Sequence, residues 1–155
     1  MKLAMPIVVS TILVGGSTMA RGAEATISSD ELEMQNNGEK AIFRGHVVLT
    51  QVPYQVYGDQ MIRTKATGIV NASGHVIGTW VSPKGEKVRV EGEQARYEPS
   101  TETVEVWGKR QVAVQLDGEK GTATFHGDRG WVYTHMPGRA KLFGQVTGHV
   151  IPSGM

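Results

Sequence analysis

The sequence predicts an all-β protein, an antiparallel roll or sandwich built from repeated strand-turn-strand units. A glycine-centred strand has its clearest copy at Ala41–Leu49, and weaker copies place the glycine at 78, 108 and 144. A small residue followed by an acid recurs in step with it, at Ser29-Asp30, Gly58-Asp59, Gly92-Glu93 and Gly127-Asp128. The spacing, roughly 30 to 36 residues, is typical of a repeat architecture. The 20 glycines, without a collagen period, suit short strands and tight turns.

The N-terminus has the three parts of a secretory signal peptide. Lys2 precedes an apolar stretch from Leu3 to Val14, and small residues lead to Ala23-Glu24-Ala25. We expect residues 1–25 to be removed, with cleavage after Ala20 as the alternative site and an uncleaved anchor as the alternative to cleavage. Residues 26–151 would then form one exported, soluble domain, with a short tail at 152–155.

The first half of this domain alternates between apolar and polar residues. A strand at 26–34 and the turn Asn36-Asn37-Gly38 precede the strand at 41–49, which directs Phe43 and Val47 inward. Pro53 marks a bend before a strand at 54–62. The turn at 71–74 precedes a strand at 75–81, and a second turn at 83–86 precedes a long strand at 87–97. Apolar parity changes across Gly92-Glu93, which predicts a bulge or kink there; the same is expected at Gly58-Asp59 and Gly127-Asp128.

Shorter strands make up the second half. We expect them at 103–106, 111–116, 122–125, 131–134 and 140–150, separated by turns that include Asp117-Gly118 and Pro137-Gly138. Without crossover helices, these strands must pair antiparallel and bury one face between two sheet surfaces. A stack of such units fits best, although a closed sheet is an alternative. A stack leaves strand edges unpaired at both ends, where another chain could add a strand.

Composition excludes several classes of function. Lys and Arg number 16 against 15 Asp and Glu, so no net field attracts nucleic acid. There are no cysteines, which excludes disulfides, thiolate metal sites and cysteine catalysis. We also find no nucleotide-binding fingerprint and no Ser-His-Asp grouping, and we expect no catalytic residues, no metal and no cofactor.

The polar residues favour structural roles over chemistry. The histidines at 46, 75, 126, 135 and 149 are scattered, and the recurring acids suit turns or strand ends better than an acid/base pair. A set of basic residues could meet phosphate groups, although a solvated face is the favoured interpretation; these residues are Arg44, Arg63, Lys65, Lys84, Lys87 and Arg89. The larger aromatic residues are either core or an accessible lining, and they are Phe43, Trp80, Tyr97, Trp107, Phe125, Trp131 and Phe143.

Several segments together resemble the OstA-like family, most closely its LptA-type lipopolysaccharide-transport members. They are Ile27-Ser28-Ser29-Asp30 with Leu32, Phe43-Arg44-Gly45-His46-Val47, Gly58-Asp59, and Gly92–Tyr97 followed by Val106-Trp107-Gly108. The resemblance covers residues 26–151, and its specificity lies in the order and spacing of the segments. The sequence departs from the family in its tryptophans at 80 and 107 and in its short tail after Val150.

The resemblance implies a twisted β-jellyroll whose open apolar groove holds the acyl chains of lipid A. It implies a periplasmic carrier that joins inner-membrane LptC-like and outer-membrane LptD-like components through sheet edges and associates head to tail with itself. The expected lipid-contacting residues are Ile27, Leu32, Phe43, Val47, Trp80, Tyr97, Val106 and Phe125. Alternatives are a structural bridge that holds no lipid, a membrane-anchored LptC-like component and an exported polysaccharide-active enzyme, the last with least support.

Overall fold

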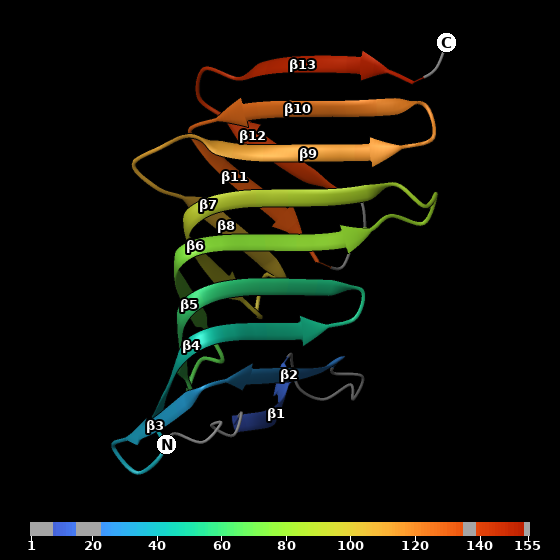
Figure 1. Cartoon of the computed structure of the whole chain (residues 1–155). Helices are drawn as coiled ribbons and strands as arrows, with labels where there is room; N and C mark the ends of the chain where they lie inside the picture. Colours follow the sequence, from blue (N-terminus) through green and yellow to red (C-terminus); the bar gives the residue numbers. More distant parts are fainter. Residues whose placement is uncertain (1–7, 15–22, 135–138, 154–155) are drawn as a thin grey trace, which may run out of the picture.

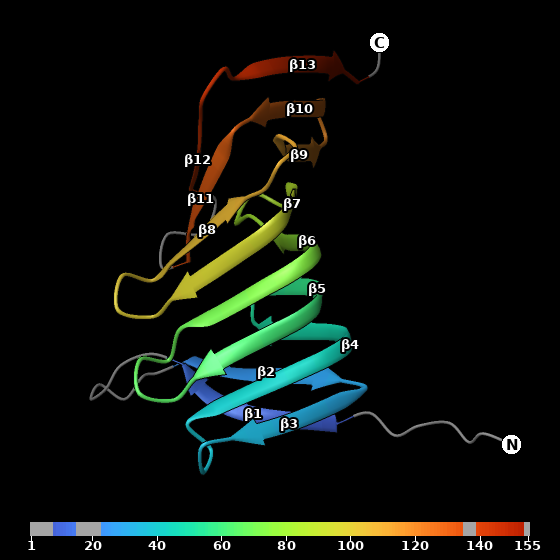
Figure 2. The ribbon, with the colours of Figure 1, turned by 90° about the vertical axis from the view of Figure 1, so that its left-hand side faces the viewer.

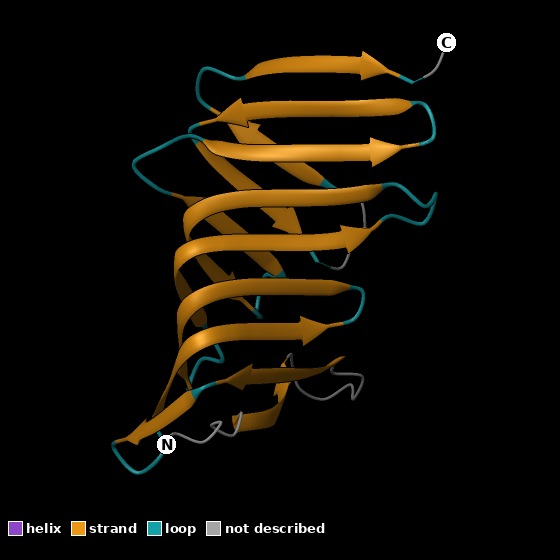
Figure 3. Cartoon of the chain, viewed as in Figure 1, coloured by secondary structure: helices purple, strands orange, loops and turns teal. Residues whose placement is uncertain are grey.

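The computed structural model describes residues 8–14, 23–134 and 139–153, and these residues form strands and turns without a helix. The strands are β1 (Val8–Val14), β2 (Ala23–Ser29), β3 (Glu31–Gln35), β4 (Lys40–Gln51), β5 (Tyr54–Thr64), β6 (Val70–Val81), β7 (Lys87–Glu98), β8 (Thr103–Trp107), β9 (Val112–Gly118), β10 (Gly121–Gly127), β11 (Arg129–Tyr133), β12 (Ala140–Phe143) and β13 (Thr147–Pro152). They form one antiparallel sheet of 13 strands (Figures 1 and 3). The all-β prediction is confirmed.

The sheet folds over on itself because its four longest strands, β4 to β7, bend near their middles. One set of halves belongs to a first layer with the order β1-β2-β4-β5-β6-β7-β9-β10-β13. The other halves belong to a second layer with the order β3-β4-β5-β6-β7-β8-β11-β12. The bend lies at the left of Figure 1, and Figure 2 looks onto it. Both layers end in edge strands within the described residues, so the twisted jellyroll is confirmed and the closed sheet is wrong.

At each bend, the side chain of one of the recurring acids lies against a glycine of a neighbouring segment. A β-carbon added to Gly45, Gly74, Gly108 or Gly144 would come within 2.9, 2.6, 2.7 or 2.7 Å of the Cβ of Asp30, Asp59, Glu93 or Asp128, respectively. Each acid precedes its glycine by 15 residues, or by 16 in the last unit. The acid therefore fills the space that a side chain would need, which is a structural role, as the sequence indicated.

The glycine of the second unit is Gly74, and its assignment to Gly78 was wrong. Gly74 has a φ of +82°, close to the +84° of Gly45, and the next residue is in the left-handed region in both units, at +51° for His75 and +49° for His46. Gly78 has a regular strand conformation and faces the interior of the protein. Gly74-His75-Val76 repeats Gly45-His46-Val47, a match that was available in the sequence.

The predicted kinks occur at the expected acids, but the extra residue lies on the glycine-bearing strand. Pairing between β4 and β5 shifts between Arg44 and Val47, and pairing between β5 and β6 shifts between Tyr57 and Gln60, opposite Ile77 and Ser73. At Gly92-Glu93, β7 changes its partner from β9 to β8. A separate strand begins after Asp128 in the fourth unit.

Two histidines at these bends form polar contacts with acids. His46 Nδ1 lies 2.8 Å from Asp30 Oδ2, and His75 Nε2 lies 2.6 Å from Glu91 Oε2. The hydrogen bond and charge of Asp30 raise the pKa of His46. The surface polar role expected for these histidines is therefore realised, for His46 beside an acid of the repeat and for His75 beside Glu91.

The interior is assembled from rows of residues that cross the strands of each layer. In the second layer, one row consists of Leu32, Phe43, Met61, Ala72, Ala95, Val106, Gly130 and Leu142. In the first layer, one row consists of Ile27, Leu49, Val56, Gly78, Val90, Val114, Phe125 and Gly148. Because side chains alternate along each strand, these rows form two apolar walls that face each other.

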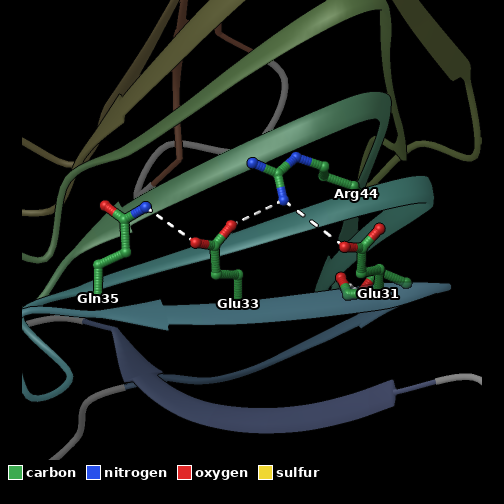
Figure 4. A network of polar contacts seen from close by, with 5 residues as sticks. Glu31, Glu33, Gln35 and Arg44 are labelled. Atoms are coloured by element: carbon green, nitrogen blue, oxygen red, sulfur yellow. Dashed lines mark hydrogen bonds and ion pairs between the residues drawn. The ribbon is translucent and has the colours of Figure 1, made fainter.

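The outer face near the N-terminal end carries ion pairs instead. Arg44 Nη1 lies 3.0 Å from Glu33 Oε1 and 3.7 Å from Glu31 Oε2 (Figure 4). The hydrogen bond from Gln35, and then that from Arg44, lower the pKa of Glu33. Arg44 therefore has carboxylate partners on a solvated face, which supports the favoured interpretation of this basic residue.

The contact between acid and glycine predicts a graded cost for adding a methyl group. Gly74→Ala should destabilise the fold by about 1–3 kcal/mol more than Gly85→Ala, because only the methyl group at 74 meets an aspartate side chain. Gly85 has a similar φ of +86° and nothing within 4 Å of its added carbon, so it carries the backbone strain alone. Urea unfolding of the three proteins measures the difference, and equal losses would contradict the steric role of Asp59.

Candidate functional site

The two walls enclose an apolar cavity in the middle of the molecule. Its volume is about 60 Å³, and nearly all of its lining is apolar. Three of the predicted residues line it, namely Trp80, Tyr97 and Val106, which are 4%, 8% and 5% exposed. Since all three are nearly inaccessible to solvent, this part of the interior is closed.

Polar side chains close the cavity by joining the two layers on the side away from the bends. The Tyr54 hydroxyl donates to the backbone oxygen of Thr134 at 3.1 Å, and the backbone oxygen of Tyr133 lies at 3.4 Å. Burial, followed by the charge of Glu102, raises the pKa of Tyr97 to about 12, while side-chain hydrogen bonds with Gln51 and Thr134 oppose the shift. We call Gln51, Tyr54, Tyr97 and Thr134 the seam.

Towards the C-terminal end, the interior widens into an open groove of about 670 Å³. Its floor consists of Val88, Val114, Leu116 and Phe125 of the first layer, and Leu142 of β12 faces them across the groove. Lys84 and Glu86, from the turn between β6 and β7, lie at its rim with opposite charges. Trp80 lines both the groove and the enclosed cavity, so it lies where the two meet.

The eight predicted lipid-contacting residues fall into three locations. Trp80, Tyr97 and Val106 line the cavity, and Trp80 and Phe125 line the groove. Ile27, Phe43 and Val47 are buried in the N-terminal half, and Leu32 packs against them from the edge strand β3. The structure thus arranges these residues along one extended interior, and their contact with lipid stays a prediction.

Three of the aromatic residues considered as core or lining lie on the outer face. Trp107, Trp131 and Phe143 pair across the second layer with Gln94, Glu105 and Arg129. The guanidinium of Arg129 lies 5.6 Å from the centre of the Trp107 ring, and the ammonium of Lys141 lies 5.7 Å from that of Phe143. Strand parity places all three rings outside, with Trp107 and Phe143 beside cations, so both interpretations of them were wrong.

Several residues that close or widen the interior were not predicted as site residues from the sequence. Tyr54, directly after Pro53, bridges the layers, while Val114, Leu116 and Leu142 line the groove. Alternation along their strands could have identified the three aliphatic residues. The bridge from Tyr54 spans 80 residues of sequence, so no local pattern could have revealed it.

The polar groups of the described chain offer little for chemistry. No group of three or more His, Asp or Glu side chains within the described residues could hold a metal ion. Of the basic set, Arg89 pairs with Glu91 at 3.6 Å on the outer face, whereas Lys84 lies at the rim of the groove. His135 and the turn at Pro137-Gly138 lie outside the described residues.

The fold defines a class of protein: an extended jellyroll whose apolar interior opens at one end. The family described as "LptA/(LptD N-terminal domain) LPS transport protein" matches residues 26–136, and the chain belongs to this family. The prediction of an OstA-like, LptA-type protein is therefore confirmed, and the family is one of transport proteins.

A solved structure shares the fold. It is the crystal structure of LptH from Pseudomonas aeruginosa, described as the LptA homologous periplasmic component of a conserved lipopolysaccharide transport device. The TM-score is 0.66 at 17% sequence identity, and the match covers 96% of each chain. Among curated protein sequences there is no significant match.

The seam predicts different costs for removing two tyrosine hydroxyls. Tyr54→Phe should lower the free energy of unfolding by about 1 kcal/mol or more, because two backbone oxygens of the opposite layer lose a donor. Tyr57→Phe is the matched control: its hydroxyl bonds to Gln55 on the exposed face, so the loss should be within about 0.5 kcal/mol. Thermal unfolding of both variants tests this, and similar small losses would show that the seam does not hold the layers together.

Proposed function

We propose that this protein carries lipopolysaccharide across the periplasm by holding lipid A acyl chains between its two layers. The observation that carries the proposal is the apolar interior, in which Trp80 lines both the enclosed cavity and the open groove, in a chain that belongs to a lipopolysaccharide-transport family. Burial of an acyl chain stabilises a complex by about 0.8 kcal/mol per methylene group. The sugar-phosphate head group stays outside, near solvent.

Handover requires no chemistry in this proposal. The ligand passes from an inner-membrane complex to this interior and then to a similar interior in an outer-membrane complex. The residues that hold acyl chains are the predicted ones, with Trp80 and Phe125 in the open groove. The N-terminal half and the cavity would take chains after side-chain rearrangement, because Ile27, Phe43 and Val47 are almost fully buried. Energy for transport comes from a partner, since the sequence has no nucleotide-binding motif.

Strand addition at the two ends of the sheet joins this chain to its partners. At the C-terminal end, β13 pairs only with β10 among the described strands, and Val150 and Ile151 are 62% and 57% exposed. At the N-terminal end, residues of the proposed signal peptide form β1 and pair with β2 over seven positions. Cleavage would free the edge of β2 for an LptC-like partner, an LptD-like partner or a second copy. Cleavage after Ala20 would leave β2 whole, whereas cleavage after Ala25 would remove its first three residues.

The anchored and structural-bridge alternatives differ from the proposal in measurable ways. N-terminal sequencing of the exported protein separates a cleaved chain from an anchored one. No helix among the described residues is both long and apolar enough to cross a membrane. A structural bridge would pair through the same edges and leave the groove without lipid.

Photocrosslinking tests the carrier function directly. A photoreactive residue in place of Phe125 should form adducts with lipopolysaccharide in cells, because this ring lies on the groove floor. The same residue in place of Gln115, which is exposed on the neighbouring strand β9, should not. Gel mobility with detection of lipopolysaccharide reads out the adduct. Absence of an adduct at both Phe125 and Trp80 in folded protein would exclude the carrier in favour of the structural bridge.

Self-association through β13 is tested by charging its exposed edge. The exported protein should form larger assemblies as its concentration rises, and Thr147→Lys with His149→Lys should weaken them about tenfold or more through repulsion at the edge. Two lysines in an exposed turn, Ser100→Lys with Thr101→Lys, provide the control for added charge. Sedimentation velocity measures the assemblies. A strict monomer at every concentration would contradict head-to-tail association.

A further inference from the structure

The indole nitrogen of Trp80 is a buried hydrogen-bond donor without a partner. It is the one such side-chain atom among the described residues, and Trp80 is only 4% exposed. An unsatisfied buried donor costs about 1–3 kcal/mol, so native proteins rarely retain one without a reason. The nearby buried tyrosines differ, because the hydroxyls of Tyr54 and Tyr97 both have partners in the seam.

The position of Trp80 connects this donor to the groove. The residue lines the enclosed cavity and the open groove, and its ring lies 5.4 Å from that of Tyr54, the residue that closes the layers. Its cross-strand neighbour is Val88, followed by Leu116 on β9, and both lie on the groove floor. A ligand chain that enters the groove therefore reaches Trp80 where the interior narrows.

The surroundings determine which acceptor suits this donor. A charged oxygen would be costly beside the apolar side chains of Val88 and Leu116. The charged groups of Lys84 and Glu86 lie at the rim of the groove. A hydroxyl group would bring a donor of its own that needs a second partner. A neutral carbonyl oxygen accepts the indole N–H and adds no unsatisfied donor.

We propose that Trp80 makes the groove specific for acylated amphiphiles, with its Nε1–H donating a hydrogen bond to an ester or amide carbonyl oxygen of the ligand. This inference rests on the proposed lipid-carrying function. It adds a polar anchor to that function, because burial of alkyl chains alone cannot distinguish an acyl chain from an ether-linked one. The anchor also sets how deep the chain lies, with its carbonyl at Trp80 and its apolar part against the interior walls.

Two matched probes test the inference. They are single-chain glycerophosphocholines with chains of equal length, one joined by an ester and one by an ether, used below their micelle concentrations. The exported protein should bind the ester about 2- to 10-fold more tightly than the ether in titration calorimetry. Trp80→Phe keeps an aromatic ring but removes the N–H, so it should abolish this difference. Trp131→Phe, on the outer face, should retain it.

Nitrogen-15 NMR of the wild-type protein gives a second measurement that does not depend on the folding of a variant. The ester should move the indole N–H resonance of Trp80 downfield, and the ether should not. Equal affinity for the two probes, or equal shifts of this resonance, would overturn the role of Trp80 and leave the carrier function standing. Failure of both probes to bind would overturn this inference, and failure of lipopolysaccharide crosslinking as well would overturn the carrier function.

Discussion

The fold depends on the contact between an acidic side chain and a glycine at each bend of the sheet. Four acids occupy the space beside four glycines, and the left-handed backbone of Gly45 and Gly74 continues into the histidines that follow them. A β-carbon on any of these glycines would clash with the acid. Because the contact recurs in every unit, neighbouring strands bend at matching positions along their length. One continuous sheet therefore forms two facing layers.

The width of the space between the two layers changes along the sheet, because polar contacts join the layers in only one region. In the middle, the seam joins them, and the remaining space is a cavity of about 60 Å³. Towards β13 the layers separate, and the groove reaches about 670 Å³ with a largely apolar floor. A fold that bends regularly thus produces an interior that changes from packed core to accessible groove, and Trp80 lies at the transition.

Much of the fold was predictable because it depends on local patterns. Alternation identified the strands and placed Phe43 and Val47 inside, and the regular spacing of the acids identified the bends. The second-unit glycine was misassigned because Gly78 lies in a similar apolar strand, although Gly74-His75-Val76 was the true copy of Gly45-His46-Val47. Trp107 and Trp131 were predicted to be core or lining residues, but they lie on the outer face. Their size and apolarity do not show which face of a strand a residue occupies.

The sequence by itself determined that this is an all-β protein of repeated units, because period and turn chemistry are local properties, and its resemblance to the OstA-like family is confirmed by the family match. It also supplied the candidate interior residues, all eight of which face inward. Only the tertiary structure decided which of them line a cavity, which line a groove and which are buried core. The reason is physical: the separation between the layers depends on contacts such as that of Tyr54 with Thr134, which join residues 80 positions apart.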